Sequence, residues 1–277
     1  MYVAYWQLNH KPFAAGTDIR AYYPAETHHA ALLKLRYAVE NRRGAALVAG
    51  PAGSGKTLLV RLLAEQLADN YRPLIHVVFP QMPAAELLAH VARQLGAGDD
   101  PRSPARGGEA TLELSVRRIE ERLLALAAEG RHAVVAIDEA HLLDGSRALE
   151  ALRLLLNFET EAGPALTLLL VGQTALVPLV ERRPQLEERL AVKCLLRPLS
   201  VEETMAYVQH RTALAGAERT IFEPAASEAL HRLTHGNPRQ INRLCDLALL
   251  IGFAEEQRTI GAEQIEAVNA ELDLAAA

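Results

Sequence analysis

The stretch that most constrains this chain is a glycine-rich loop of sequence Gly-Pro-Ala-Gly-Ser-Gly-Lys-Thr, which begins at Gly50. The five apolar residues before it, 45–49, are typical of a short buried strand, and residues 57–67 carry leucines at helical spacing. In such a loop, backbone N–H groups converge on phosphate oxygens at a helix N-terminus, where the helix dipole also favours anions. A turn that merely precedes a helix is the alternative, but every fixed position of the G-x-x-x-x-G-K-[ST] pattern is filled. The stretch therefore predicts a nucleotide-binding P-loop.

Two side chains of this loop are expected to act on the nucleotide directly. Lys56 should reach the β- and γ-phosphates, and the Thr57 hydroxyl should ligate Mg²⁺. ATP and Mg²⁺ are therefore the expected cofactors. The predicted nucleotide-binding residues here are Gly50, Pro51, Ala52, Gly53, Ser54, Gly55, Lys56, Thr57 and Leu58.

Composition adds only broad limits. With 277 residues, of which 50% are apolar and 23% charged, the chain is long enough for one α/β core and a smaller appendage. A net charge of −5 gives no global attraction to nucleic acid or anionic membrane, although it does not exclude a local basic patch. The two cysteines, Cys194 and Cys245, lack metal-ligand spacing, and the N-terminus lacks a signal-peptide pattern. We expect a cytoplasmic protein.

Residues 162–180 contain no charged side chain, and the length of this uncharged stretch is close to that of a membrane span. Glycines and prolines interrupt the stretch at several positions. It therefore predicts a buried strand over 165–171 followed by a short helix, and we expect no membrane span.

Strands and helices alternate along most of the chain, which predicts an α/β fold with a parallel five-stranded sheet between helices. The expected strands are 45–49, 73–79, 132–137, 165–171 and 191–196. The expected helices of this part are 26–41, 57–67, 83–95 and 109–129, with a surface loop over 96–108. We expect three regions: an aromatic segment and helix packed on the core (1–43), the P-loop domain (44–198) and a small helical domain (199–277).

An apolar strand runs directly into two acids, Asp138 and Glu139, and supplies the second half of the predicted chemistry. Asp138 is expected to hold Mg²⁺ in the Walker B role, and Glu139 to polarise the water that attacks the γ-phosphate. A solvated acidic turn is the alternative, but the upstream P-loop favours a catalytic site. His141 is either a residue that supports this site or a polar residue at a helix start.

Three further residues are candidates for sensing nucleotide. Gln173 follows a buried strand at the edge where open α/β sheets bind ligands, so it is a sensor 1 candidate or a helix cap. Arg189 is the first choice, and Arg183 the second, for an arginine finger that enters a neighbouring subunit. A solvated surface role is the alternative for both.

The helical domain begins with a capping-box pattern at Ser200, and helices are expected over 201–215, 224–235, from 238 onward, and over 261–274. Asn237 and Pro238 supply an N-cap and a first-turn proline. Arg239 follows them, where a cation opposes the helix dipole. A bound phosphate would compensate for this, which makes Arg239 a sensor 2 candidate; a structural ion pair is the alternative.

These motifs together resemble the ExeA/GspA-type AAA+ ATPases of bacterial general secretion, which are related to the transposition ATPases. The matching segments are Met1-Tyr2, Lys11-Pro12-Phe13, the P-loop, Ile137-Asp138-Glu139-Ala140, Leu170-Val171-Gly172-Gln173, Leu196-Arg197-Pro198-Leu199-Ser200, Gly236-Asn237-Pro238-Arg239 and Ile241-Asn242. The resemblance implies an AAA+ fold, oligomerisation around nucleotide, and the roles already given to the site residues. His141 stands where this family commonly has Gln.

The resemblance leaves more than one function open. The first is Mg²⁺-dependent ATP hydrolysis by an oligomer that drives or regulates assembly of an envelope or secretion complex. The second is an ATP-dependent DNA-binding regulator similar to the transposition ATPases. A small-molecule P-loop kinase is a third interpretation, which the helical domain with Arg239 disfavours.

Overall fold

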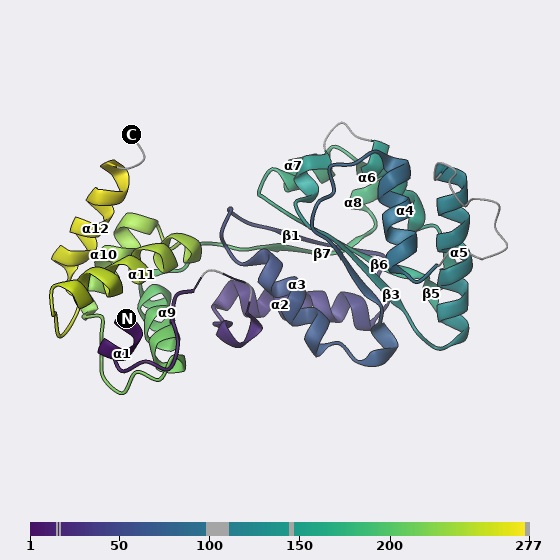
Figure 1. Ribbon diagram of the computed structural model, residues 1–277. Helices are drawn as coiled ribbons and strands as arrows, with labels where there is room; N and C mark the ends of the chain where they lie inside the picture. The colour runs from purple at the N-terminus through teal and green to yellow at the C-terminus, as the bar shows by residue number, and fades with distance from the viewer. Residues whose placement is uncertain (15, 17, 98–110, 144–146, 275–277) are drawn as a thin grey trace. The chain divides into compact units, whose positions relative to one another are not determined.

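The computed structural model describes residues 1–277 except 15, 17, 98–110, 144–146 and 275–277 (Figure 1). Contacts divide the chain into two compact units. The sheet unit comprises Thr27–Gly50 and Leu59–Leu196, and the helical unit comprises Met1–Glu26, Pro51–Leu58 and Arg197–Ala277. The P-loop thus groups with the helical unit. Most of the loop expected over 96–108 lies outside the described residues.

The sheet unit contains the five-stranded parallel sheet predicted from the sequence. Its order is β2-β3-β6-β1-β7, so the first and last strands in this order are its edges. The strands are β1 (Ala45–Ala49), β2 (Leu74–Val77), β3 (Ala133–Ile137), β6 (Leu166–Gly172) and β7 (Leu190–Leu195). Because β1, β3 and β6 are buried at every position, both faces of the sheet's centre must be covered.

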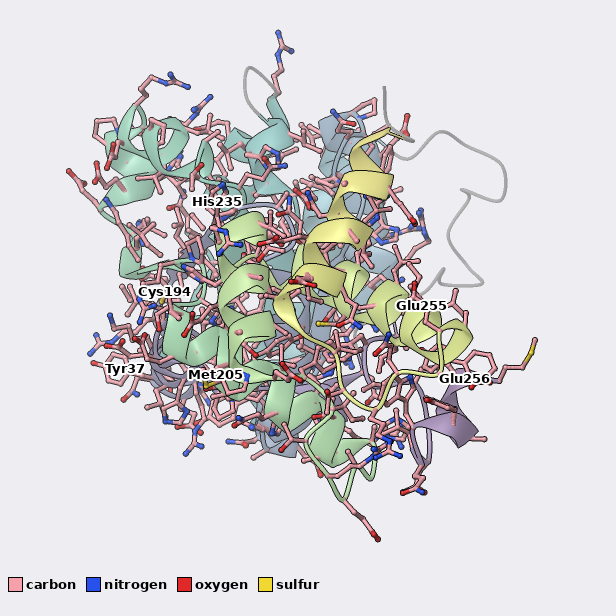
Figure 2. The ribbon with its side chains drawn as sticks, turned by 90° about the vertical axis from the view of Figure 1, so that its left-hand side faces the viewer. Tyr37, Cys194, Met205, His235, Glu255 and Glu256 are labelled. Carbon is pink, nitrogen blue, oxygen red and sulfur yellow. The ribbon has the colours of Figure 1, made fainter. Side chains whose placement is uncertain are left out.

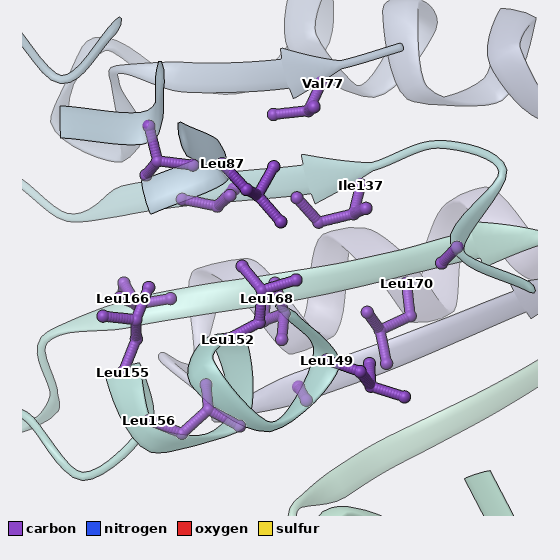
Figure 3. Close-up of a cluster of buried hydrophobic side chains, with 14 of the residues drawn as sticks. Val77, Leu87, Ile137, Leu149, Leu152, Leu155, Leu156, Leu166, Leu168 and Leu170 are labelled. Atoms are coloured by element: carbon purple, nitrogen blue, oxygen red, sulfur yellow. The ribbon is translucent and has the colours of Figure 1, made fainter. Parts of the chain in front are cut away.

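Helices cover the two faces of this sheet. Figure 1 shows α2 (Glu26–Glu40) and α3 (Lys56–Gln66) on the opposite side of the sheet from α4 (Ala84–Gln94), α5 (Leu112–Ala128) and α6 (Arg147–Leu155). The latter side holds the main apolar core, in which side chains of β3 and β6 meet leucines of α4 and α6 (Figure 3). The remaining short elements are α7 (Leu176–Glu181), α8 (Pro184–Glu187), the hairpin β4 (Glu159–Thr160) and β5 (Gly163–Pro164), and the 3-10 turns η1 (Ile19–Ala21), η2 (Asp69–Tyr71) and η3 (Ala140–Leu143).

The uncharged stretch 162–180 forms β5, the central strand β6 and all of α7 except its last residue, so the expected strand and short helix are both present. All seven residues of β6 are buried within the sheet. No helix in the described part of the chain combines the length and apolar character needed to cross a bilayer.

The helical unit is built on α9 (Val201–Leu214), α10 (Pro224–Thr234), α11 (Pro238–Ala254) and α12 (Ala262–Leu274). The capping box predicted at α9 is present, since Ser200 Oγ accepts from the Glu203 backbone while the Glu203 carboxylate accepts from the Ser200 backbone. Figure 2 shows Glu255 and Glu256 in the turn that follows α11. Every helix expected after residue 199 is therefore observed.

The N-terminal aromatic segment differs from expectation. It was expected on the ATPase core, but with α1 (Tyr2–Tyr5) it contributes to the apolar core of the helical unit. Trp6 is fully buried there, its Nε1 donates to Leu249 O at 2.8 Å, and Gly252 leaves room for its ring. The buried Arg211 guanidinium donates to Pro12 O at 2.8 Å. The segment buries its aromatic area against α9 and α11, whereas α2 from Thr27 onward belongs to the sheet unit.

Candidate nucleotide-binding and hydrolysis site

The P-loop links β1 to α3, in the strand-loop-helix order that the pattern requires. Gly53 and Gly55 have φ angles of +80° and +90°, a region that residues with a Cβ rarely adopt. The helix begins at Lys56, so Thr57 and Leu58 lie in its first turn. Lys56 is buried, and its Nζ donates to Pro51 O at 2.8 Å within the same loop. The lysine side chain therefore folds back onto its own loop at the N-terminus of α3.

The helical unit brings Arg239 beside this loop. Arg239 is exposed in the first turn of α11, two residues after the N-cap Asn237. A Cβ built on Gly53 would lie 2.7 Å from Arg239 Cβ, so the two backbones approach closely. The first turn of α11 therefore lies directly against the P-loop.

In the sheet unit, Asp138 stands directly after β3, at the carboxyl edge of the sheet. Its side chain is only 2% exposed, and both carboxylate oxygens have neighbours. Oδ1 accepts from Glu139 N at 2.9 Å, and Oδ2 lies 3.3 Å from Nε2 of His76 on β2. A carboxylate is an oxygen donor of the kind that Mg²⁺ prefers.

Glu139 has a different environment from its neighbour. Its side chain is 41% exposed, and its backbone has a φ of +50°, which is unusual for a residue other than glycine. The hydrogen bond from its N–H to Asp138 helps to hold this conformation. Its Oε2 lies 3.4 Å from Nδ1 of His141. Backbone outliers of this kind concentrate at functional sites, which supports a role for Glu139 in the chemistry.

Gln173 lies on the same edge, directly after β6. Its backbone N–H donates to Nδ1 of His141 at 3.3 Å. Gly172 permits this approach, because a Cβ there would lie 3.2 Å from both N and Nδ1 of His141. Next to β6, the end of β1 is fixed by Gly50 N, which donates to Gly172 O at 3.2 Å. The sheet unit therefore gathers Asp138, Glu139 and Gln173 on one edge, with His141 between the last two.

Arg189 lies immediately before β7, at the end of the sheet where the parallel strands begin, which is opposite to the end that carries Asp138 and Glu139. Its backbone O accepts from Ala45 N at 3.1 Å, and its guanidinium donates to Asn157 Oδ1 at 3.2 Å. A five-residue strand spans about 16 Å, which exceeds the reach of an arginine side chain. Arg189 therefore does not reach, in its own chain, the carboxyl end of the sheet that carries Asp138 and Glu139.

The second candidate for the arginine finger, Arg183, has a local partner. Its guanidinium donates to Leu179 O at 2.7 Å.

Two histidines of this region were not assigned to the site from the sequence. The contact of His76 with Asp138 depends on β2 lying beside β3, and local periodicity does not reveal strand order. For His141 the sequence left two interpretations open, and its contacts favour the one in which it supports the site. A polar residue on the otherwise apolar strand β2 was the available signal for His76.

Comparisons with known proteins agree with this geometry. The family described as AAA domain matches residues 39–180, which is just over half of the chain. General secretion pathway protein A of Aeromonas hydrophila is 36% identical over 264 residues, covering 94% of this chain. The chain spans only 46% of that relative's length.

Solved structures share the fold at low sequence identity. Cdc6p of Pyrobaculum aerophilum aligns with a TM-score of 0.70 at 14% identity, covering 94% of this chain and 70% of the other. The ORC2 protein of Aeropyrum pernix aligns with a TM-score of 0.65 at 18% identity, covering 88% and 66%. The Thermotoga maritima RuvB branch migration motor gives 0.56 at 18%, covering 87% and 67%.

The family match over residues 39–180 includes both the P-loop between β1 and α3 and the acidic residues that follow β3. The chain belongs to the AAA domain family and is an AAA+ ATPase similar to general secretion pathway protein A.

Proposed function

We propose that this chain hydrolyses ATP with Mg²⁺, acts in the cytoplasm as an oligomer, and drives or regulates assembly of a bacterial envelope or secretion complex. The observation that carries the hydrolysis is the contrast between two adjacent carboxylates. Asp138 is buried with both oxygens engaged, whereas Glu139 is partly exposed on a left-handed backbone. Such a pair separates the tasks of holding a metal and activating water.

The P-loop provides the binding half of the site. In this proposal its backbone N–H groups and Lys56 hold the phosphates, and Thr57 and Asp138 hold Mg²⁺, which supplies charge neutralisation at the transferring phosphate. The glycines at positive φ and the helix that starts at Lys56 support this assignment. The proposal requires the P-loop and the acidic edge of the sheet to act on the same nucleotide.

The hydrolytic half follows from the groups at the sheet edge. Glu139 accepts a proton from water as that water attacks the γ-phosphate, and the Gln173 amide orients the same water or the phosphate oxygen. Arg239 contacts the γ-phosphate from the helical unit. Arg189 would act only on nucleotide bound by a neighbouring subunit, because it lies at the far edge of its own sheet.

The biological role rests on one relative. General secretion pathway protein A is 36% identical, and the match covers nearly all of this chain but less than half of the relative. A role in an envelope or secretion complex is inferred from that name. The fold-level neighbours do not support a choice of partner, since their identity to this chain lies between 14% and 18%.

An ATPase assay on the purified chain, with and without duplex DNA, tests this function. We expect Mg²⁺-dependent turnover that Lys56→Ala abolishes together with ATP binding. Turnover that needs DNA, with binding that weakens steeply as salt rises, would instead indicate the DNA-binding regulator. Retained ATP affinity in Lys56→Ala would contradict the P-loop assignment.

A further inference from the structure

The segment Gly236-Asn237-Pro238-Arg239 joins α10 to α11 in a conformation that its residue types explain. Gly236 has a φ of +71°, and a Cβ there would lie 2.0 Å from Leu199 O, so no other residue fits. Pro238 occupies the first turn of α11, where its missing N–H costs nothing. The segment is therefore fixed at both ends, which leaves the Asn237 side chain in a defined position.

The two ends of the Asn237 amide have different partners. Its Oδ1 accepts from Arg239 N at 3.1 Å and so caps α11. Its Nδ2 donates to Ala52 O, in the P-loop, at 2.8 Å. One side chain thus terminates a helix and holds the phosphate-binding loop.

The approach between this side chain and the loop is too close for any loop residue but glycine. A Cβ built on Gly53 would lie 2.7 Å from Asn237 Oδ1 and 2.7 Å from Arg239 Cβ. Gly53 also has a positive φ, so its identity satisfies two independent requirements. Gly53 stands at a variable position of the G-x-x-x-x-G-K-[ST] pattern, and here it serves the contact with Asn237 as well as the turn.

Holding a carbonyl matters in a loop that binds anions through its N–H groups. Each peptide unit carries its N–H and C=O in opposite directions, so a hydrogen bond that fixes the Ala52 carbonyl also fixes the direction of the Gly53 N–H. Ala52 is exposed, so water is the available alternative partner for its carbonyl when the Asn237 amide is removed. A partner on a capped helix reduces the conformational freedom that nucleotide binding must otherwise remove.

We infer that Asn237 is a positioning residue for the P-loop: its Nδ2 holds the Ala52 carbonyl so that the loop is organised for phosphate before nucleotide binds. The inference rests on the proposed function, because it takes the loop to be the nucleotide site. Since the contact acts on the loop itself, it should affect ADP and ATP equally. Arg239, proposed to contact the γ-phosphate, should affect ATP more than ADP.

The test exploits the fact that Asn, Asp and Ser are all good N-caps. Asn237→Ser keeps the helix cap, lacks the amide donor and adds no charge, and Asn237→Asp replaces the donor by an acceptor that repels the Ala52 carbonyl. We expect the Kd for ADP and for ATP to rise by about fivefold in Asn237→Ser and by about tenfold or more in Asn237→Asp, as the loss of one hydrogen bond predicts. Thermal unfolding of both variants should stay close to that of the wild type.

Isothermal titration with ADP and with a non-hydrolysable ATP analogue measures these affinities, and Arg239→Ala is the matched comparison. An unchanged ADP affinity in Asn237→Ser would overturn the inference, because a loss confined to Asn237→Asp reflects charge repulsion alone. Equal loss of affinity and of thermal stability would also overturn it, since that result assigns Asn237 to helix capping only. If the proposed function is wrong, the wild type itself will not bind nucleotide. If only the inference on Asn237 is wrong, the wild type will bind and Asn237→Ser will bind equally well, so the two failures are distinguishable.

Discussion

His141 is the residue whose contacts are most informative about chemistry at this site. Its Nδ1 lies 3.4 Å from Glu139 Oε2 and 3.3 Å from Gln173 N. The Gln173 N–H needs an unprotonated Nδ1 as acceptor, whereas a carboxylate needs a protonated Nδ1 as donor. In any one tautomer of His141, Nδ1 can therefore hydrogen-bond either the Glu139 carboxylate or the Gln173 N–H, but not both.

This geometry predicts a kinetic effect that is separate from binding. His141→Ala should lower kcat by about tenfold while leaving the Kd for ATP within about twofold, because only the orientation of Glu139 and Gln173 changes. His141→Gln retains an amide that can donate or accept, and should recover most of the rate. Steady-state kinetics and equilibrium nucleotide binding measure the two quantities.

The matched control is His29→Ala, which removes an exposed histidine from α2. It should change neither quantity. A fall in ATP affinity in His141→Ala that equals the fall in kcat would contradict this role for His141.

At the scale of the elements, a buried polar chain connects β3, β6 and the segment before β1. Thr167 Oγ1 donates to Arg43 O at 2.9 Å, so its only hydrogen is used and Nε2–H of His132 must donate to Thr167. His132 is 1% exposed, and burial lowers the pKa of its imidazole to about 4, with a smaller contribution from Arg42. The imidazole is therefore neutral in the folded protein at neutral pH.

A defined pH dependence of stability follows. Between pH 6.5 and 4 the unfolded chain carries a proton on His132 that the folded chain lacks, so the free energy of unfolding must fall as the pH falls through this window. The loss should reach about 2 kcal/mol at pH 4.5. Urea denaturation at pH 7 and pH 4.5 measures it.

The comparison is with His132→Gln, which keeps a polar side chain but does not titrate. The variant should be less stable at pH 7, yet lose about 2 kcal/mol less than the wild type on going to pH 4.5. Parallel losses in the two proteins would show that His132 does not control this window. His29→Gln, at an exposed site, should behave like the wild type.

The elements also show what periodicity predicts and what it misses. Strand β1 was predicted with its observed bounds, because a short apolar run bounded by glycine has few alternatives. Helix α6 was not predicted, although Ala148, Leu149, Leu152 and Leu155 repeat at helical spacing and are all buried. The sequence therefore carries the periodic signal of this helix.

Contacts between distant residues were the harder part. The partner of Trp6 is Leu249, more than two hundred residues away, and nothing in the aromatic segment indicates which unit it joins. The contact of His76 with Asp138 depends on strand order, and the contact of Asn237 with Ala52 depends on tertiary approach. Motifs therefore predicted the residue types of the site, while its supporting contacts required the structure.

For the whole molecule, the position of Arg189 predicts cooperation between subunits. It lies at the sheet edge opposite to Glu139, so a catalytic role requires nucleotide bound by another copy. Arg189→Ala and Glu139→Gln should each have low turnover alone, because every active site of the assembly then lacks either the guanidinium or the carboxylate. Mixing them should restore part of the rate, since some sites then combine an intact Glu139 with an intact neighbouring Arg189.

The mixing experiment has its control in Arg182→Ala, an exposed arginine at the end of α7. Alone it should retain turnover. An absence of rescue at every mixing ratio would remove Arg189 from the active site and leave it as a residue that contacts Asn157.

The proposed hydrolysis site is tested most directly by the separation of binding from hydrolysis in Glu139→Gln. Equilibrium binding of ATP and steady-state turnover are measured on the same preparation, with the wild type beside it. We predict that the variant binds ATP within about threefold of the wild type and loses about 10²-fold or more of its turnover, because the amide cannot accept the proton of the attacking water. Retained turnover, or parallel loss of binding and turnover, would contradict the assignment of Glu139 as the residue that activates water.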